Sequence, residues 1–347
     1  TWGTNSVELD SNGLNFQGNS DVYEVKYTTN GQSVNLIYSD ATQGWIPLED
    51  DVVADEPVQP PTQKAIFGYG KTSSDVSLTN LVNSSGVVAA DVTGVGTARN
   101  NLAASSYGGD KAIFGYGRTS TQVSMTNLVN NSGVVATDVS GVGTARQSLA
   151  AASYGGDKAI FGYGTDSSLT NLVNNNGVVG SDVTGVGTAR NDLAAASFGG
   201  DKAIFGYGYY YSGGVVTYSL TNLVSNTGVV AADVTGVGTA RYLLAAAGYG
   251  GDKAIFGFGT TGSVTGLTNL VSNTGVVASN VSAVGTARKG LAAAGYGGDK
   301  AIFGYGTTGS LTAITNLVNN SGVVASDVSG VGTAREKPAA AGFSYAA

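Results

Sequence analysis

The sequence predicts an all-β protein in which a six-bladed β-propeller follows a small β module, and the main observation is an internal repeat. One motif recurs six times, and the lysine of its KAIFG segment marks each copy: Lys64, Lys111, Lys158, Lys202, Lys253 and Lys300. The copies lie 47, 47, 44, 51 and 47 residues apart, a period typical of propeller blades or solenoid turns. Glycine, at 54 of 347 residues, suits a chain with many tight turns.

Each copy contains four predicted strands separated by turns rich in glycine and asparagine. In chain order they are LAAASY, KAIFGYG, LTNLVN and VVASDVTG, here called strands a, b, c and d. Four strands per copy favour a propeller blade over a solenoid turn. We expect the alanines of strand a to line the axis, where larger side chains would collide.

The two ends of the repeat region favour a closed ring. The first strand b, at Lys64, has no strand a before it, whereas a last strand a, residues 338–343, has no strand b after it. An open solenoid gains nothing from this offset, but in a ring the last strand a can complete the first blade. The sequence therefore predicts a propeller closed by its C-terminal strand.

Residues 1–48 do not match the repeat and predict a small β module for anchoring or oligomerisation. Residues 22–27 and 34–38 are β-rich, and we expect them to form a hairpin across Asn30-Gly31. Residues 49–63 have the acidic, proline-rich composition of a linker, and residues 64–347 form the predicted propeller. Because so short a module buries little surface by itself, we expect it to pack on another subunit or on the propeller, and the protein to be a homo-oligomer.

Composition excludes several classes of protein. The net charge is −7, and 12 of the 17 basic residues are the evenly spaced Lys and Arg of the repeat, so no basic patch for nucleic acid is expected. The chain has neither cysteine nor histidine, and we therefore expect no disulfide, no metal site and no cofactor. No apolar run approaches 18 residues, so no membrane span is predicted.

Two motifs of the repeat have both a structural and a functional interpretation. The GYG and GGDK glycines resemble phosphate-binding loops, but no helix follows them, and we interpret them as turns. Five of the six copies carry an aspartate eight residues before the Arg of the TAR triplet, and Asn280 replaces it in the fifth: Asp91, Asp138, Asp182, Asp233 and Asp327. A catalytic carboxylate pair of a glycosidase should be unique. The recurrence instead indicates ion pairing within or between blades, and we expect no enzymatic activity.

Differences between the copies indicate which face of the propeller is functional. All length variation lies between strands b and c, where the last Gly of each G-aromatic-G is followed after 10, 10, 7, 14, 10 and 10 residues by the Asn of TNL. The residue after each repeat Arg also varies: Asn100, Gln147, Asn191, Tyr242, Lys289 and Glu336. In an antiparallel blade the b–c loop and the d–a connection emerge on one face, here called the variable face. The a–b and c–d turns form the constant face. A diversified face on a constant scaffold is typical of a binding surface.

The longest b–c loop marks the centre of the predicted binding site. It carries Tyr209, Tyr210, Tyr211 and Tyr218, and Tyr242 follows the next repeat Arg. Tyrosine offers a rigid apolar ring and a hydroxyl, and it is enriched in recognition surfaces. We expect these tyrosines to contact a ligand together with Asn191 and Lys289. The alternative is that they cover a gap in the fourth blade.

The run TAR-x-x-LAAA-x-YGGDKAIFGYG, with its copies in residues 63–347, resembles the kelch-type repeat. In that repeat an Arg precedes strand a and glycines end strand b. The sequence departs from it where Gly-aromatic-Gly replaces a Gly-Gly doublet, and where Leu, Val and Gly replace the Tyr and Trp of strands c and d. The resemblance implies a propeller fold.

The stretch SVNLIYSDATQGWIPLEDDVVADEP, residues 33–57, is similar to segments of tailed-phage structural proteins, particularly fibre-like and virion-surface proteins. This resemblance implies a non-enzymatic adhesion protein on a tail or head appendage. Residues 1–48 would then bind other virion proteins, and the propeller would bind a host surface glycan or receptor. The alternative is a secreted or cell-surface bacterial propeller, either a lectin or a glycan-active enzyme. For that enzyme Asp166 and Asp192 are candidate carboxylates without a spacing signal.

Overall fold

The computed structural model describes residues 7–12, 14–17, 25–27, 35–47, 64–282 and 284–344. All regular secondary structure in these residues is β, as predicted. The chain divides into two compact units, Thr1–Pro60 and Pro61–Tyr345, and each is described by itself. The predicted linker, residues 49–63, lies outside the described residues.

The N-terminal unit contains two antiparallel strand pairs. One pairs β1 (Val7–Leu9) with β2 (Val25–Tyr27), and the other pairs β3 (Leu36–Tyr38) with β4 (Trp45–Pro47). Its small core is formed by Phe16 and Tyr27, against which Leu9, Leu36 and Trp45 pack.

The hairpin predicted between residues 22–27 and 34–38 is wrong for the described residues, because β2 pairs with β1, and β3 turns back onto β4. The reason lies in the turn after β3. Asp40 Oδ1 accepts hydrogen bonds from the backbone N–H groups of Thr42 and Gln43, both at 2.8 Å. These bonds hold the pKa of Asp40 below its usual value. An Asp-capped turn of this kind reverses the chain without an Asn-Gly pair.

The second unit, here called the repeat domain, consists of six three-stranded antiparallel sheets and one additional hairpin. In the order of strands a, b and c, the sheets are β24 (Ala339–Phe343), β5 (Lys64–Gly68) and β6 (Thr79–Val82); β7 (Ala103–Tyr107), β8 (Lys111–Gly115) and β9 (Thr126–Val129); β10 (Ala150–Tyr154), β11 (Lys158–Gly162) and β12 (Thr170–Val173); β13 (Ala194–Phe198), β14 (Lys202–Gly206) and β17 (Thr221–Val224); β18 (Ala245–Tyr249), β19 (Lys253–Gly257) and β20 (Thr268–Val271); β21 (Ala292–Tyr296), β22 (Lys300–Gly304) and β23 (Thr315–Val318). The hairpin is β15 (Tyr209–Tyr211) with β16 (Val215–Thr217).

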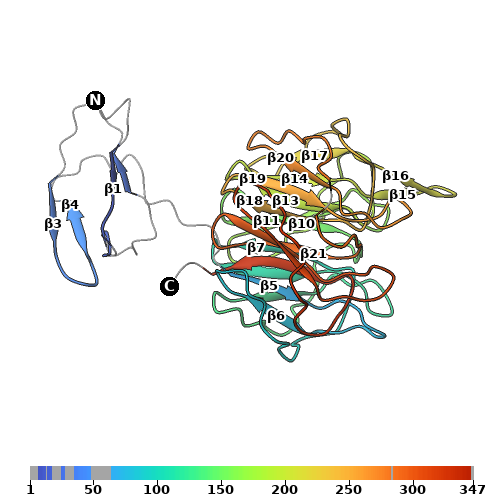
Figure 1. Ribbon diagram of the computed structural model, residues 1–347, viewed down its shortest axis with the longest axis horizontal. Coiled ribbons are helices and arrows are strands. Elements are labelled where there is room, and N and C mark those ends of the chain that lie inside the picture. Colours follow the sequence, from blue (N-terminus) through green and yellow to red (C-terminus); the bar gives the residue numbers. More distant parts are fainter. Residues whose placement is uncertain are drawn as a thin grey trace. The chain divides into compact units, whose positions relative to one another are not determined.

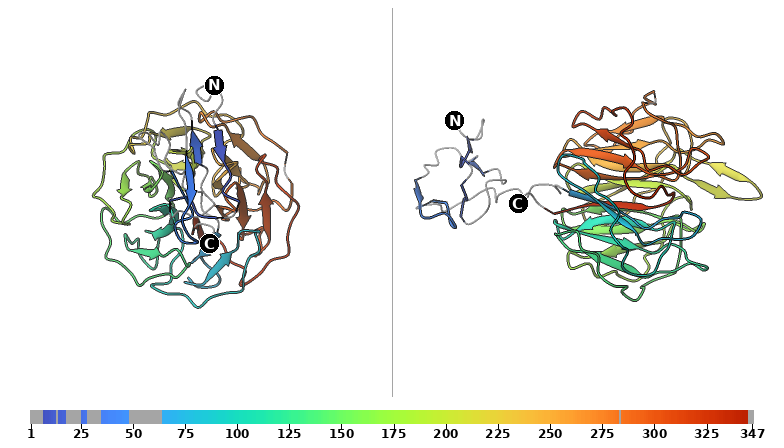
Figure 2. Two further views of the ribbon diagram at one scale, coloured as in Figure 1. Left: turned by 90° about the vertical axis from the view of Figure 1, so that its left-hand side faces the viewer. Right: turned by 60° about the horizontal axis from the view of Figure 1, so that its bottom comes forward.

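The sheets stand around a common axis in a β-propeller-like arrangement (Figure 2). Each strand a lies beside the strands a of two other sheets, and β24 contacts both β21 and β7. The last strand of the chain pairs with the first strand of the domain, with Ala339 opposite Gly68 and Phe343 opposite Lys64. Segments from the two ends of the repeat region therefore form one sheet.

The predicted fourth strand of each copy is not a regular strand. In the first copy the d segment meets β6 only at two isolated bridges, Val82 with Val88 and Thr79 with Val92. Between them the Asn80 side chain donates from Nδ2 to the carbonyl of Ala89 at 3.0 Å. A side-chain amide thus replaces part of the backbone ladder, and the sheets have three strands instead of the predicted four.

The core lies between neighbouring sheets and depends on the glycine that ends KAIFG. A Cβ on Gly68 would lie 2.6 Å from the ring of Phe114 in the next sheet. The same fit recurs between successive copies, and Phe67 of the first copy occupies the corresponding place against Gly304 of the last. Glycine is required at these positions because the aromatic ring of the adjacent sheet fills the space of a side chain.

The repeat arginine joins successive sheets. Arg99 is fully buried, and its Cζ lies 4.3 Å from the ring centroid of Tyr69. Its Nε donates to the carbonyl of Tyr116 at 2.9 Å and its Nη2 to Asn127 Oδ1 at 2.7 Å, both in the next copy. Arg335 of the last copy makes the corresponding bonds to the first, to the Tyr69 carbonyl and to Asn80 Oδ1.

The predicted ion pairing of the repeat aspartates is confirmed between copies for Asp138 and Asp182. Arg99 Nη1 lies 3.9 Å from Asp138 Oδ1, and Arg146 Nη1 lies 3.7 Å from Asp182 Oδ1. The shorter contacts of Asp138 are with Thr97, whose N–H and Oγ1 donate to Oδ2 at 3.0 and 2.6 Å. Burial raises the pKa of Asp138, but the hydrogen bonds from Thr97 and Asn127 outweigh it and hold the pKa below its usual value.

Candidate functional site

The variable face is built where the two variable places of the sequence meet. In five of the six copies the residue after the repeat Arg forms an antiparallel bridge with the b–c loop of the next copy, and in the remaining copy Gln147 donates its N–H to Thr165 Oγ1 of that loop at 3.0 Å. Asn191, for example, donates its N–H to the Tyr209 carbonyl at 2.7 Å and accepts from the Tyr209 N–H at 2.9 Å. The predicted placement of both variable segments on one face is therefore confirmed.

The longest b–c loop is the β15–β16 hairpin, which projects from the repeat domain (Figure 1). Its turn is closed by the Ser212 N–H and the Gly214 carbonyl, 3.1 Å apart, and Gly213 has a φ of 71°. Tyr211 and Val215 face each other at its tip and are 61% and 53% exposed. An insertion that the sequence predicts as a loop is thus an ordered arm with an exposed apolar tip.

The predicted tyrosines are placed at different depths along this arm. Tyr209 packs on Tyr242 with ring centroids 4.9 Å apart and ring planes inclined by 59°. Burial, assisted by the nearby charges of Asp192 and Asp166, raises the pKa of Tyr209 to about 12. Tyr210 and Tyr218 are half-buried, and Tyr211 is exposed. The base of the arm is therefore a packed aromatic pair, and its tip is open to a partner.

Asn191 contacts the tyrosine arm through its backbone, whereas its side chain binds Asp166, and Lys289 lies one copy away from the arm. Asn191 is buried, and both polar atoms of its side chain bind Asp166, through Nδ2 to Oδ1 at 2.5 Å and through Oδ1 from the Asp166 N–H at 3.0 Å. It orders the shortest b–c loop. Lys289 is half-buried and pairs through its backbone with Thr307, one copy beyond Tyr242.

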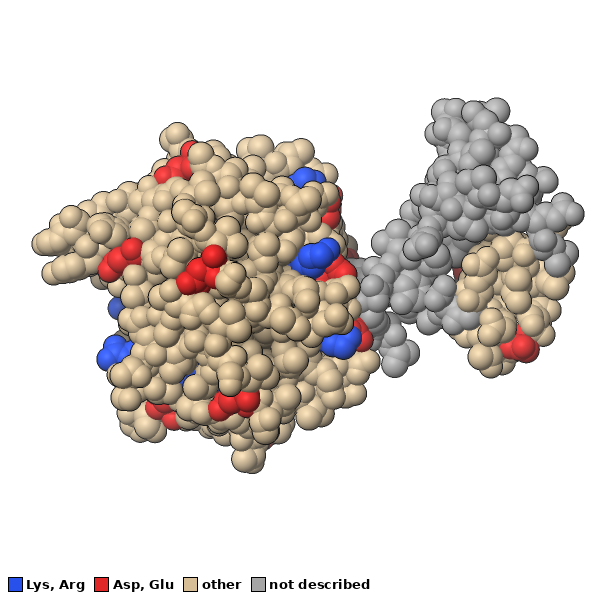
Figure 3. Space-filling view, turned by 180° about the vertical axis from the view of Figure 1, so that it is seen from behind, with Lys and Arg blue, Asp and Glu red and all other residues tan. Residues whose placement is uncertain are grey.

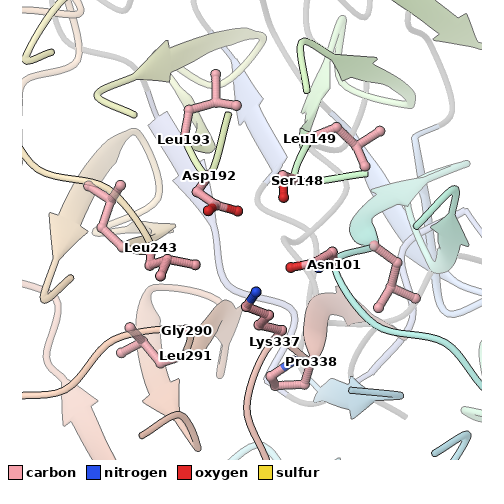
Figure 4. Close-up of a pocket in the computed structure, with 12 residues that line it drawn as sticks. Asn101, Ser148, Leu149, Asp192, Leu193, Leu243, Gly290, Leu291, Lys337 and Pro338 are labelled. Carbon is pink, nitrogen blue, oxygen red and sulfur yellow. The ribbon is translucent and has the colours of Figure 1, made fainter. Parts of the chain in front are cut away.

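A pocket of about 70 Å³ lies at the axis of the repeat domain, next to the variable face (Figure 4). The second and third residues after each repeat Arg line it: Asn101, Leu102, Ser148, Leu149, Asp192, Leu193, Leu243, Leu244, Gly290, Leu291, Lys337 and Pro338. We call it the axial pocket. Sequence reasoning missed it, although the signal was available. The second residue differs in all six copies, whereas the third is leucine in five.

The six residues at the second position form the rim of the axial pocket. All have left-handed φ angles of 48–61°. Ser148, Asp192, Leu243, Gly290 and Lys337 each donate their N–H to the carbonyl of the preceding rim residue, over 2.7–2.9 Å. These backbone hydrogen bonds pass from copy to copy around the axis and fix the direction of each side chain.

Opposite charges occupy opposite sides of the rim. Asp192 is the third of the six rim residues and Lys337 the sixth, and both side chains point into the pocket, as does Asn101 (Figure 4). Burial raises the pKa of Asp192, while the Lys337 ammonium and the Ser148 hydroxyl act in the other direction. The pocket is thus polar on one half and apolar at Leu243 and Gly290.

On the side drawn in Figure 3, charged side chains are scattered over the repeat domain without a basic cluster. The described residues contain no group of acidic side chains arranged to hold a metal ion. They also include no helix with the length and apolarity needed to cross a membrane.

No protein-family model matches the chain, and no curated protein matches it.

Proposed function

We propose that the protein is a non-enzymatic adhesion protein of a virion surface that binds a host surface glycan through its variable face. The observation that carries this proposal is the segregation of variation. Loops of three lengths, the tyrosine arm and the unequal rim of the axial pocket all lie on one face, while the opposite turns repeat almost unchanged. Binding surfaces vary on a fixed scaffold in this way.

The scaffold in this proposal is a six-bladed propeller closed by its C-terminal strand. Three contacts between the first and last copies support closure: β24 pairs with β5, Phe67 packs on Gly304, and Arg335 binds the Tyr69 carbonyl. Closure would give β5 the same strand partner that the other copies have and would hold the rim of the axial pocket rigid.

The topology also supports anchoring through residues 1–48. The repeat domain begins at Lys64 and its last strand ends at Phe343, and these paired residues stand where the other copies have their a–b turns. Both are therefore on the constant face of the repeat domain, opposite the variable face. In the N-terminal unit Ile37 and Tyr38 are 44% and 45% exposed, which suits contact with another virion protein or another copy of the chain.

The alternative, a secreted or cell-surface bacterial propeller, shares the binding face and differs in location or chemistry. A glycan-active enzyme with a carboxylate pair is less well supported than a binding protein. Of the twelve described residues that line the axial pocket, Asp192 alone carries a carboxylate. The Asp166 carboxylate accepts a hydrogen bond from Asn191 and lies in the neighbouring loop.

A paired substitution tests the proposed function. Replacing Tyr210 and Tyr242 by Ala should weaken binding of the full chain to host cells or to a glycan array by about 1–3 kcal/mol, because a few aromatic anchors dominate most interfaces. The control is Asn130→Ala in a c–d turn of the constant face, where Asn130 Oδ1 accepts from the Val134 N–H at 2.9 Å. Loss of binding in the control together with full binding by the tyrosine variant would overturn the assignment.

A further inference from the structure

The rim of the axial pocket keeps side chains where the backbone favours glycine. A left-handed φ costs a residue with a Cβ roughly 1–2 kcal/mol relative to glycine. Only Gly290 among the six rim residues is glycine, although all six adopt this conformation. A rim with a purely structural role would have no reason to retain Ser, Asp, Leu and Lys at equivalent positions. Strained residues of this kind concentrate at binding sites.

The two rim charges do not neutralise each other directly. Asp192 and Lys337 stand three copies apart in a ring of six, so they face each other across the pocket (Figure 4). None of the ion pairs among the described residues joins them. The space between them thus has a negative pole, where Ser148 stands beside Asp192, and a positive pole, where Asn101 and Lys337 are neighbours.

The size and walls of the pocket limit what fits between the poles. A volume of about 70 Å³ accommodates about five to seven water molecules at 10–15 Å³ each, and so a ligand of a similar number of non-hydrogen atoms. Leu243 and Gly290 line the side away from Ser148 and Asn101. That wall suits a short hydrocarbon segment, as in small-molecule pockets that combine apolar walls with a few polar groups.

We propose that the axial pocket binds a small zwitterion, with its ammonium at Asp192 and Ser148 and its acidic group at Lys337 and Asn101. Two sources have this chemistry: a free short amino acid, and an aminoalkyl phosphate substituent on a surface glycan. The second source rests on the proposed function, and the first does not. The site is distinct from the tyrosine arm, whose exposed tip is formed by Tyr211 and Val215.

Calorimetric titration of the full chain tests the proposal with four small probes. β-Alanine and 2-aminoethyl phosphate carry both charges, whereas ethylamine and acetate carry one each. The proposal predicts saturable binding of at least one zwitterion below about 10 mM and no saturation by ethylamine or acetate. Tighter binding of 2-aminoethyl phosphate assigns the glycan source, and tighter binding of β-alanine assigns the free amino acid. Equal binding of ethylamine, or no binding of either zwitterion, would overturn the proposal.

Substitutions of the two charged rim residues test whether the zwitterion binds in the axial pocket. Asp192→Asn and Lys337→Gln should each weaken zwitterion binding by about tenfold or more, because each leaves one ligand charge without its partner. Asn tolerates the left-handed conformation, so the rim is retained. Asp157→Asn and Lys300→Gln make the same charge changes in turns of the constant face, outside the pocket, and should leave binding unaltered. If the two pocket variants bind as the wild type does, the assignment is wrong.

The same variants separate this proposal from the proposed function. The Tyr210→Ala, Tyr242→Ala chain should still bind the zwitterion, because these side chains do not line the axial pocket. Loss of glycan attachment with intact zwitterion binding therefore supports both proposals. Zwitterion binding by a wild-type chain that attaches to no glycan contradicts the proposed function alone. Attachment without zwitterion binding contradicts the pocket assignment alone.

Discussion

At the scale of single residues, the repeat depends on polar side chains that act between copies. In the first copy Arg99 donates to a carbonyl and to an Asn side chain of the next sheet, and Asp138 of that sheet accepts a hydrogen bond from Thr97 of the preceding TAR triplet. Each copy is therefore incomplete without its neighbours. Asn280 makes the equivalent contacts to Thr239, accepting from its N–H at 3.1 Å and donating to its Oγ1 at 2.7 Å.

Because the repeat aspartates are ionised in the folded protein, we expect the protein to lose stability in acid. The pKa of Asp138 is lowered in the folded state from its usual 3.8, so its ionised form stabilises the fold above that pH and the contribution is lost as pH falls through the lower, folded pKa. Asp138→Asn should therefore be less stable than the wild type at pH 7, by about 1 kcal/mol or less for so exposed a group.

The difference between wild type and Asp138→Asn should be smaller at about pH 2 than at pH 7, because the contribution of the ionised carboxylate is lost as the pH falls through its folded-state pKa. Urea denaturation at the two pH values measures it. Asn280→Asp is the matched control. This variant should be more stable than the wild type at neutral pH, and its advantage should decrease in acid. Equal stability differences at both pH values would contradict this account.

At the scale of elements, the sequence was sufficient to predict strands a, b and c of every copy, because their alternating apolar residues and glycine turns are local signals. It failed at strand d for a reason that no local pattern contains. The Asn80 amide reaches across to Ala89 and takes the place of backbone pairing. It also failed to predict that residues 209–217 pair as a hairpin, because Tyr-rich and Val-rich segments fit an exposed loop equally well.

The axial pocket could be foreseen only in part. Comparison of the copies identifies the second residue after the repeat Arg as variable, but the left-handed φ of Ser148, Asp192 and Lys337 depends on hydrogen bonds between copies. Asp192 and Lys337 lie opposite each other because of their positions around the axis, and no spacing along the chain indicates it. Such properties belong to the assembled sheets around the axis.

A loop exchange tests the role of the β15–β16 arm. Residues 210–219 can be replaced by residues 261–266, the equivalent segment of the fifth copy, which keeps Tyr209 packed on Tyr242. Because the exposed tip contributes little to the core, the free energy of unfolding should change by about 1 kcal/mol or less, while glycan binding should be lost. Thermal denaturation and a glycan array measure the two effects. A large loss of stability would instead support the alternative in which the tyrosines cover a gap in the fourth blade.

At the scale of the whole molecule, the C-terminal strand has the largest predicted effect on stability. Deletion of residues 336–347 removes β24, and with it the pairing of β5 and the buried side chain of Phe343. We expect a loss on the order of 5 kcal/mol from the strand's hydrogen bonds and apolar burial, measured as a fall in melting temperature.

The control for this deletion removes residues 345–347 alone and keeps β24, so the melting temperature should be close to that of the wild type. A synthetic peptide of residues 336–344 added to the truncated chain should restore part of the lost stability, because it can occupy the vacant edge of β5. An unchanged melting temperature after the longer deletion would contradict the closed, six-bladed arrangement that we propose.

The most direct test of the central claim, that the variable face binds the host glycan, is hydrogen–deuterium exchange. The full chain is compared with and without surface polysaccharide purified from a bacterium to which it attaches. The account predicts slower exchange of backbone amides at residues 209–218 and around Tyr242, and unchanged exchange in the constant-face turns at residues 108–110 and 130–133. Protection confined to the constant-face turns, with none in the arm, would contradict it.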